Sequence, residues 1–320
     1  MGVGIGVGIA ALATLYSKLT GGVALGWLLG RVLPASTPQK LGWFQYWLGV
    51  PLGMVIFLRW ADLTGAIWLA PVLAWAVTFT GAAIAWLWLQ RAKLAPESEG
   101  TFILSVMFGN TGYIGYPIAL SLVGETYFGW VVFYDLLGTT LGAYGLGVFF
   151  AQAFSSGPLE LWSWRRLGEI ARNPVWWSFL LGLGLRSVAL PATVETTLRG
   201  LGWTLIMTSL VLIGMRFAQL KAGQQWQTAW VSVGTKMVLV PLLFGLALKL
   251  GAISLGGSES AIAAPLQLTL VLQMAMPPAF ATLVVSEAYD LDRDLAVTVI
   301  LLGSILLLAL LPVWLWAFGG

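Results

Sequence analysis

Four polar side chains lie inside long apolar runs of this 320-residue sequence. Asn110 and Gln273 can donate and accept hydrogen bonds without carrying a charge, which lowers the cost of burying them. Asp135, in VVFYDLLGTT, could bind a proton or a cation, or could be an interfacial carboxylate that reaches polar headgroups. Lys236, in VSVGTKMVLV, could attract an anion, pair with Asp135 or extend to the nearer membrane surface. Binding of ions is therefore the chemistry that these residues favour.

The sequence lacks the residues that most enzymes and metal sites require. It contains no His and no Cys, which excludes an imidazole base, a thiolate nucleophile, a disulfide and the usual ligands of zinc or haem. No G-x-S-x-G motif occurs, and the apolar runs hold no cluster of carboxylates. Ser232 stands one helical turn before Lys236, so Ser–Lys chemistry is formally possible, but nothing marks an oxyanion hole. We expect no enzyme activity, no cofactor and no metal site.

The composition indicates that these side chains are surrounded by a lipid bilayer. Hydrophobic residues make up 59% of the chain and charged residues only 9%, against about 25% charged residues in soluble domains. The 18 tryptophans, many of them near the ends of apolar runs, fit an interfacial belt. The runs predict an all-α polytopic membrane protein with ten transmembrane helices. The predicted spans are about 3–29, 42–58, 66–89, 101–123, 128–152, 174–192, 201–218, 226–250, 262–286 and 295–318.

The fourth span contains residues that destabilise a helix. Glycines and a proline surround Asn110 and Thr111 in MFGNTGYIGYPIALSL, residues 107–122. In hydrocarbon, a broken backbone persists only where it is buried in protein or lines a wet cavity. A break also leaves half-helix ends, with their partial charges, near the middle of the membrane. The alternative is that Gly and Pro merely allow close helix packing.

The two halves of the chain resemble each other. LPAST at 33–37, LGW at 41–43 and RWADL at 59–63 return as LPATV, LGW and RFAQL, at offsets of 157, 160 and 157 residues. Five spans in each half place the second copy in the membrane upside down, as in many secondary transporters. Adding 160 to Pro117 gives Pro277, in LQMAMPPAFATLVV. Both halves therefore interrupt their fourth helix at matching places.

Two such breaks would cross at the bilayer centre and form one polar site. We predict that residues from both breaks bind the substrate, with Asp135 and Lys236 as candidates for coupling or charge recognition. The predicted binding residues are Asn110, Thr111, Gly112, Gly115, Pro117, Gln273, Met276, Pro277 and Pro278.

The basic residues between the spans predict the orientation. The odd-numbered connections hold ten basic residues and the even-numbered ones four, which puts the odd connections in the cytoplasm and both termini outside. The longest polar connection, residues 155–173, separates a first repeat at 1–154 from a second at 174–320. Because the basic residues lie between apolar runs, we read the pI near 9.2 as membrane topology and expect no nucleic-acid partner. Lys18 lies within the first span, where extension to the surface is the simplest expectation.

GNTGYIGYPIAL resembles the fourth-helix motif of the auxin efflux carrier family, which includes plant auxin exporters and bacterial malonate or malate carriers. RNPVWWSFLLGLGL, TKMVLVPLL and MAMPPAFATLVVSEAYDLD extend the resemblance over essentially the whole chain. It implies two inverted five-helix repeats with crossed, proline-broken helices 4 and 9. It also implies a scaffold of helices 1, 2, 6 and 7, often a homodimer, and a moving transport domain of helices 3–5 and 8–10. The double proline of AMPPAF, with no Asn beside it, and Lys18 depart from the family pattern.

The resemblance implies a secondary transporter of a small organic anion, auxin-like or a dicarboxylate, that works by elevator-like alternating access. The short central connection is similar to prokaryotic members, which implies the prokaryotic inner membrane. A cation-coupled symporter or antiporter of the bile-acid type, driven by H⁺ or Na⁺, is the related alternative. A channel is another class, but the spans show no polar pore-lining stripe.

Overall fold

The computed structural model describes residues 9–155, 172, 174–220, 223, 225–253 and 264–319. Within these ranges all regular structure is helical, apart from one isolated backbone bridge between residues 109 and 278. The predicted connecting loop at 155–173 lies outside the described residues, except for Ser155 and Arg172. The all-α prediction is thus confirmed for the described part of the chain.

The first half of the chain contains two long helices that pass through π-helical turns and one helix that is interrupted. The elements are α1 (Ile9–Val32), α2 (Thr37–Phe44), η1 (Gln45–Gly49), α3 (Val50–Leu58), α4 (Leu69–Leu89), α5 (Pro96–Met107), α6 (Gly115–Leu122), α7 (Phe128–Phe133), η2 (Tyr134–Thr140), η3 (Ala143–Gly147) and α8 (Val148–Phe154). Because α2 to α3 and α7 to α8 are continuous, they correspond to the second and fifth predicted spans. The fourth predicted span is divided between α5 and α6.

The second half contains a matching set of elements. They are α10 (Pro174–Gly184), the 3₁₀ turn η4 (Leu185–Ser187), α11 (Ala192–Gln219), α12 (Trp226–Gly234), η5 (Thr235–Leu239), α13 (Val240–Lys249), α14 (Ala264–Met274), α15 (Phe280–Ala288) and α16 (Arg293–Phe318). Helix α11 begins nine residues before the predicted start of its span at 201. Its first turns contain several exposed threonines. Threonine fits into a helix but does not extend an apolar run, so the hydrophobic pattern predicted too late a start for this helix.

In the part of the chain that the structure describes, six helices, some of them compound, are long and apolar enough to cross a membrane. The four other predicted spans correspond to α1, to α10 and to the two interrupted segments. The six helices are 37–58, 69–89, 128–154, 192–219, 226–249 and 293–318.

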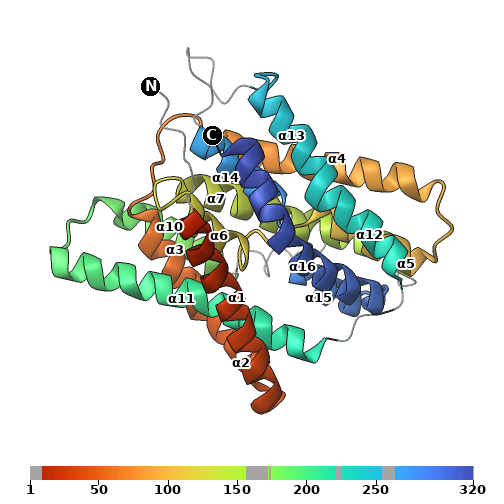
Figure 1. Ribbon diagram of the computed structural model, residues 1–320, viewed down its shortest axis with the longest axis horizontal. Coiled ribbons are helices and arrows are strands. Elements are labelled where there is room, and N and C mark those ends of the chain that lie inside the picture. Colours follow the sequence, from red (N-terminus) through yellow and green to blue (C-terminus); the bar gives the residue numbers. More distant parts are fainter. Residues whose placement is uncertain are drawn as a thin grey trace.

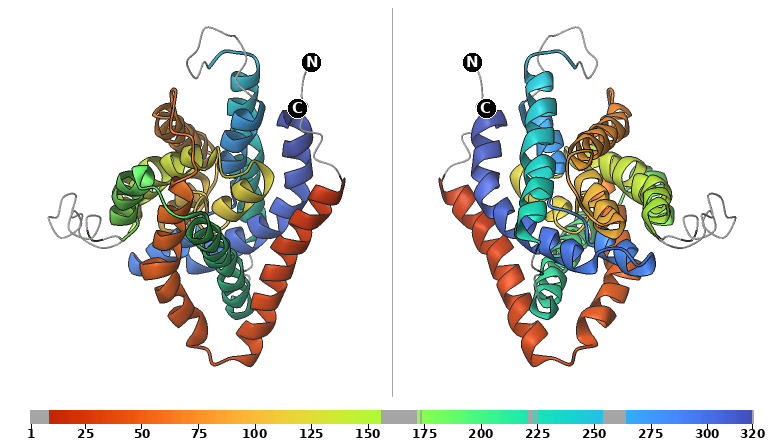
Figure 2. Two further views of the ribbon diagram at one scale, coloured as in Figure 1. Left: turned by 90° about the vertical axis from the view of Figure 1, so that its left-hand side faces the viewer. Right: turned by 90° about the vertical axis from the view of Figure 1, so that its right-hand side faces the viewer.

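Helices α1 and α11 pack against each other at very short range. A Cβ atom at Gly26 would lie 2.0 Å from the carbonyl oxygen of Val211, and a Cβ atom at Gly214 would lie 2.0 Å from that of Val23. Only glycine permits this approach, which is the small-residue packing typical of membrane helices. Figure 2 shows α1 and the α2–α3 segment as two arms joined at their turn, with α11 between the arms.

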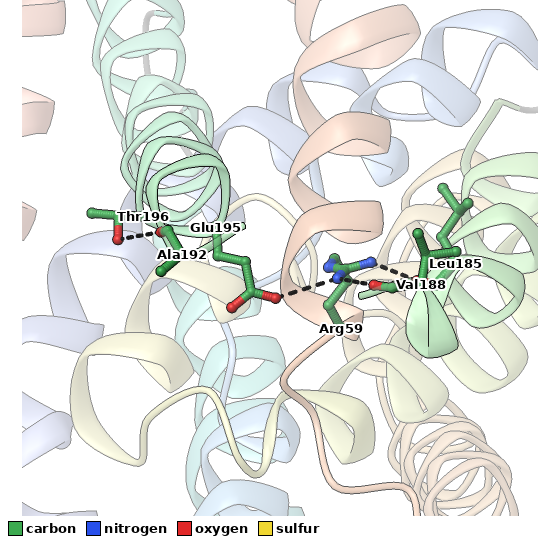
Figure 3. A network of polar contacts seen from close by, with 6 residues as sticks. All are labelled: Arg59, Leu185, Val188, Ala192, Glu195 and Thr196. Atoms are coloured by element: carbon green, nitrogen blue, oxygen red, sulfur yellow. Dashed lines mark hydrogen bonds and ion pairs between the residues drawn. The ribbon is translucent and has the colours of Figure 1, made fainter. Parts of the chain in front are cut away.

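The end of α3 is fixed to α11 and to the segment before it by one arginine. Arg59 donates hydrogen bonds to the carbonyl oxygens of Leu185, at 2.5 Å, and Val188, at 2.7 Å, and its guanidinium lies 3.4 Å from the carboxylate of Glu195 (Figure 3). Helix α10 packs along α3. Together α1, α2–α3, α10 and α11 form one group of helices. In Figure 1, α11 crosses α1 and the α2–α3 segment.

The remaining helices pack around the two interrupted segments. One hydrophobic cluster joins α5, α12, α14 and α16, and a second joins α3, α4, α7 and η2. The α5–α6 segment contributes to both, because Ile114 and Ile118 belong to the first cluster and Tyr116 and Leu120 to the second. The first break therefore lies where the two cores meet.

Candidate functional site

The first break is a stretch of seven non-helical residues, 108–114. Helix α5 ends at Met107, and Phe108 is extended, with φ −114° and ψ 122°. Pro117 lies in the first turn of α6, where a proline is tolerated because the missing N–H would have no partner within the helix. The proline therefore starts the second half-helix, while the glycine-rich residues before it form the break.

The second break contains its prolines. Helix α14 ends at Met274, and α15 begins at Phe280 after the extended residue Ala279. Pro277 and Pro278 lie between them and pack against α16, where a Cβ atom at Gly303 would lie 2.8 Å from Cδ of Pro278.

The two breaks pair with each other through their backbones. The amide of Asn110 donates to the carbonyl of Pro277 at 2.7 Å, and the amide of Ala279 donates to the carbonyl of Phe108 at 3.0 Å. These bonds form the antiparallel bridge at Gly109, where a Cβ atom would lie 3.2 Å from the carbonyl oxygen of Met276. Each break thus satisfies backbone groups that the other leaves free, which is what a non-helical segment inside a membrane requires.

Lys236 lies against this bridge. Its side chain is only 2% exposed, and a Cβ atom at Gly109 would lie 3.2 Å from its Cε. Within the described residues its ammonium group has neither a hydrogen-bond acceptor nor an ion-pair partner. Because the side chain is buried, the alternative that Lys236 extends to the membrane surface is wrong. A buried cation without a partner is costly and calls for an anion.

Two carboxamides near the breaks also have unpaired atoms. Nδ2 of Asn110 and both polar atoms of Gln273 are buried and have no hydrogen-bond partner among the described residues. The Gln273 amide lies at the start of α6, where a Cβ atom at Gly115 would be 2.7 Å from its Oε1. Buried polar atoms in proteins are nearly always paired, so an unpaired set of this kind marks a place that can receive a ligand.

Asp135 approaches the first break from another side. This carboxylate, 7% exposed in the π-helical turn η2, accepts hydrogen bonds from the hydroxyls of Thr111, Thr140 and, at 2.8 Å, Tyr116. The interfacial alternative for Asp135 is therefore wrong. Pairing with Lys236 is also wrong, since no ion pair joins the two residues in the described structure. A π-helical turn within an α-helix often accompanies a functional site.

A comparison with known protein families identifies the chain. The model of the membrane transport protein family matches residues 30–154 and 164–315, which is most of the sequence. The chain belongs to this family. The resemblance to the auxin efflux carriers is thereby confirmed.

Two archaeal relatives carry the same general description. An uncharacterized transporter of Methanothermobacter thermautotrophicus is 29% identical over 302 residues, which cover 91% of this chain and 93% of the relative. An uncharacterized transporter of Methanocaldococcus jannaschii is 26% identical over 235 residues, which cover 70% of each chain. Membership of the membrane transport protein family and the apolar helices indicate an integral membrane protein, and they agree with the expectation that the chain is not an enzyme.

The predicted site residues of this transport protein divide between two places. Asn110, Gln273 and Met276 lie beside the backbone bridge, with Gln273 against Gly115. Thr111 and Gly112 lie beside Asp135, since a Cβ atom at Gly112 would be 3.4 Å from its Oδ2. Of the two predicted charge candidates, Asp135 lies beside Thr111 and Gly112, and Lys236 lies beside Gly109.

Sequence reasoning missed the contacts of Tyr116 and Gly303, and it considered Ser232 only as a partner of Lys236 in catalysis. Tyr116 was within the quoted motif but was not connected with Asp135. Ser232 is fully buried one turn before Lys236, and its hydroxyl is unpaired among the described residues. Gly303 could have been found from LLGS at 301–304, which repeats LLGT at 136–139.

Proposed function

We propose that this protein is a secondary transporter of a small organic anion, auxin-like or a dicarboxylate, and that it works by alternating access. The observation that carries the proposal is Lys236, a buried cation that has no partner among the described residues and lies against the paired backbone of the two breaks. A carboxylate bound there would remove the cost of leaving the ammonium unpaired.

The unpaired neutral groups at the two breaks support an organic anion rather than a simple ion. Nδ2 of Asn110 and Nε2 of Gln273 can donate to carboxylate oxygens, and Oε1 of Gln273 can accept from a ligand N–H or O–H. Ser232 adds a hydroxyl that can do either. A single cation matches one carboxylate, so a second carboxylate of a dicarboxylic acid would have to use the amide donors.

The proposed architecture is two inverted five-helix repeats with crossed fourth and ninth helices. It is supported by the sequence echoes, by the breaks at 108–114 and 275–279, and by equivalent packing, since α1 lies along α11 as α10 lies along α3. Arg59 and Arg216, equivalent in the two halves, both end a helix of this group.

An elevator-like motion would carry the helices around the breaks past the group formed by α1, α2–α3, α10 and α11. Few polar contacts join the two groups at the break. The hydroxyl of Ser209 donates to the carbonyl of Tyr113 at 2.9 Å, and Arg199 pairs with Glu125 at 3.0 Å. We further propose that the protein lies in the cell membrane with both termini outside. We also propose that it forms a homodimer through the group formed by α1, α2–α3, α10 and α11.

Coupling to a cation is the second proposal, and Asp135 favours it. Three hydroxyls surround this carboxylate, and one of them belongs to Thr111 in the first break. Binding of H⁺ or Na⁺ at Asp135 would therefore act on the residue next to Asn110. A change of occupancy at the carboxylate could be transmitted to the anion site without a direct ion pair.

The proposal is tested with Asn110→Ala in purified protein reconstituted into liposomes. Uptake and equilibrium binding would be measured for malonate, malate and aromatic monocarboxylates. We expect anion binding to weaken about tenfold or more, because one or two charge-assisted hydrogen bonds, worth about 1.5–3 kcal/mol each, are lost.

Gln267→Ala is the matched control. Gln267 is also a buried amide, but it lies in α14 away from the break and donates to the carbonyl of Gly245 at 3.0 Å. Its loss should lower thermal stability without changing anion affinity. If Asn110→Ala takes up every anion as the unmodified protein does, the breaks are not the substrate site.

A further inference from the structure

A second cation lies at mid-span on the surface formed by α1 and α11. Lys18 is the tenth residue of the 24-residue helix α1, about 14 Å along a helix of about 36 Å. Its side chain is exposed, yet at this height a membrane offers it neither water nor lipid headgroups. An ionisable residue in such a position usually faces a water-filled cavity or a partner.

Lys18 has no anionic partner within the described structure. Its ammonium lies 5.5 Å from the centre of the Trp203 ring, a cation–π contact that stabilises the cation but leaves its charge uncompensated. The indole N–H of Trp203 is directed to Glu125, at 3.4 Å, and the carboxylate of Glu125 pairs with Arg199 at 3.0 Å. The carboxylate that contacts Trp203 is thus already held by another cation.

Lys18 lines a groove of about 530 Å³ between the two helices. This volume is in the range of small-molecule sites. Gly22 also lines the groove, Met207 and Val211 supply apolar surface, and Trp203 forms part of the wall. The hydroxyls of Thr204 and Thr208 also line the groove; each donates to its own helix backbone and can rotate toward a ligand.

A polar row leads along α11 to this groove. Its members are spaced by three or four residues, so they share one face of the helix, and they are exposed except for the last, which is half-buried. They are Thr193, Thr197, Gly200, Thr204 and Thr208. The neighbour of the last member, Ser209, donates to the carbonyl of Tyr113 in the first break. The row therefore runs from one end of α11 to the back of the proposed transport site.

We propose that the groove at Lys18 is a second anion-binding site for a monocarboxylate with an aromatic or apolar body. The monocarboxylate would enter the groove from water along the polar row of α11. The carboxylate would pair with Lys18, and the body would lie on Trp203, Met207 and Val211. Binding at Lys18 does not depend on the proposed function. Only the role of this site rests on that function: it would hold the anion near the breaks before the anion reaches Lys236.

The test is equilibrium dialysis of the full-length protein in lipid nanodiscs with radiolabelled phenylacetate, with its neutral twin phenylacetamide as comparison. We expect two phenylacetate sites per chain. Lys18→Met and Lys18→Gln should each weaken one site at least tenfold, and Lys18→Arg should retain it. Lys236→Met should remove only the other site, so a failure of the proposed function leaves the Lys18 site measurable, and the reverse also holds.

Arg31→Met is the matched control, because Arg31 is another cation of α1 that lies over a tryptophan, 3.6 Å from the Trp27 ring centre. It should leave both sites unchanged. The inference is overturned if the unmodified protein binds no phenylacetate, if Lys18→Met keeps every phenylacetate site, or if phenylacetamide occupies the Lys18 site equally well. It is also overturned if dodecanoate added in the lipid displaces phenylacetate there while aqueous monocarboxylates do not compete, since the site would then be filled from the bilayer.

Discussion

Replacement of Lys236 by methionine should separate a ligand-binding role from a structural one. Methionine has a similar length, and it removes a charge that is 2% exposed and has no partner among the described residues. Exchange of a buried ion pair for apolar side chains is often neutral or stabilises proteins by about 1–4 kcal/mol, and a buried charge without a partner has no attraction to lose in such an exchange. With about 2 °C per kcal/mol in a chain of this size, Lys236→Met should raise the Tm of the ligand-free protein by about 2–8 °C.

The same substitution should greatly weaken anion binding. Removal of one partner of a buried charge pair costs about 3–5 kcal/mol, which corresponds to a loss of affinity of about 100- to 4,000-fold. Ligand-induced thermal shifts and equilibrium binding of malonate and phenylacetate would measure both effects on one preparation. In the unmodified protein a bound anion should raise the Tm, and in the variant this rise should disappear.

Lys249→Met provides the comparison. Lys249 ends α13, the same compound helix, where its ammonium is exposed and donates to the carbonyl of Ala317 at 2.9 Å. Its replacement should leave anion affinity unchanged and should not raise the Tm. A Lys236→Met protein that is less stable than the unmodified one and binds anions equally well would refute the reasoning, because the ammonium would then have a structural partner.

Two further predictions concern the carboxylate and the close contact of the breaks. Asp135→Asn should flatten the dependence of uptake on pH or sodium, whereas Asp62→Asn should not, because Asp62 lies in an exposed loop where a hydrogen bond from a backbone amide lowers the pKa of its carboxyl. An Asp135→Asn protein with an unchanged profile would make this carboxylate structural. Gly115→Ala should reduce anion binding at least tenfold, since its Cβ would lie 2.7 Å from Oε1 of Gln273 and displace that amide. Gly145→Ala, which meets no atom within 4 Å, should bind anions normally, and equal binding by both variants would exclude Gln273 from the site.

The sequence predicted the helical architecture and the positions of both breaks, because these depend on local chemistry. Runs of apolar residues require membrane helices, and Gly or Pro in the middle of a run destabilises a helix wherever it folds. Asn110 and Lys236 could likewise be selected in advance, since a polar side chain in an apolar run is unusual in any fold.

What the sequence could not predict depends on contacts between distant segments. Nothing local indicates that Lys236 lies against Gly109, or that the hydroxyl of Tyr116 is bound to Asp135. The start of α11 at Ala192 was missed because exposed threonines fit a helix without adding to an apolar run. The π-helical turns at Asp135 and Lys236 have no sequence signature that the hydrophobic pattern would reveal.

The two halves provide the same broken backbone but different charges. Alignment of LLGT at 136–139 with LLGS at 301–304 gives an offset of 165 residues and places Ile300 opposite Asp135. Helix α4, which would correspond to the helix of Lys236 in the proposed inverted repeat, contains no charged residue between Leu69 and Leu89. In that arrangement one half contributes the carboxylate, beside Thr111, and the other contributes the cation, beside Gly109. The backbone hydrogen bonds from Asn110 to Pro277 and from Ala279 to Phe108 join the two breaks. If the breaks move together, binding of a cation at Asp135 would change the affinity of Lys236 for an anion through these bonds.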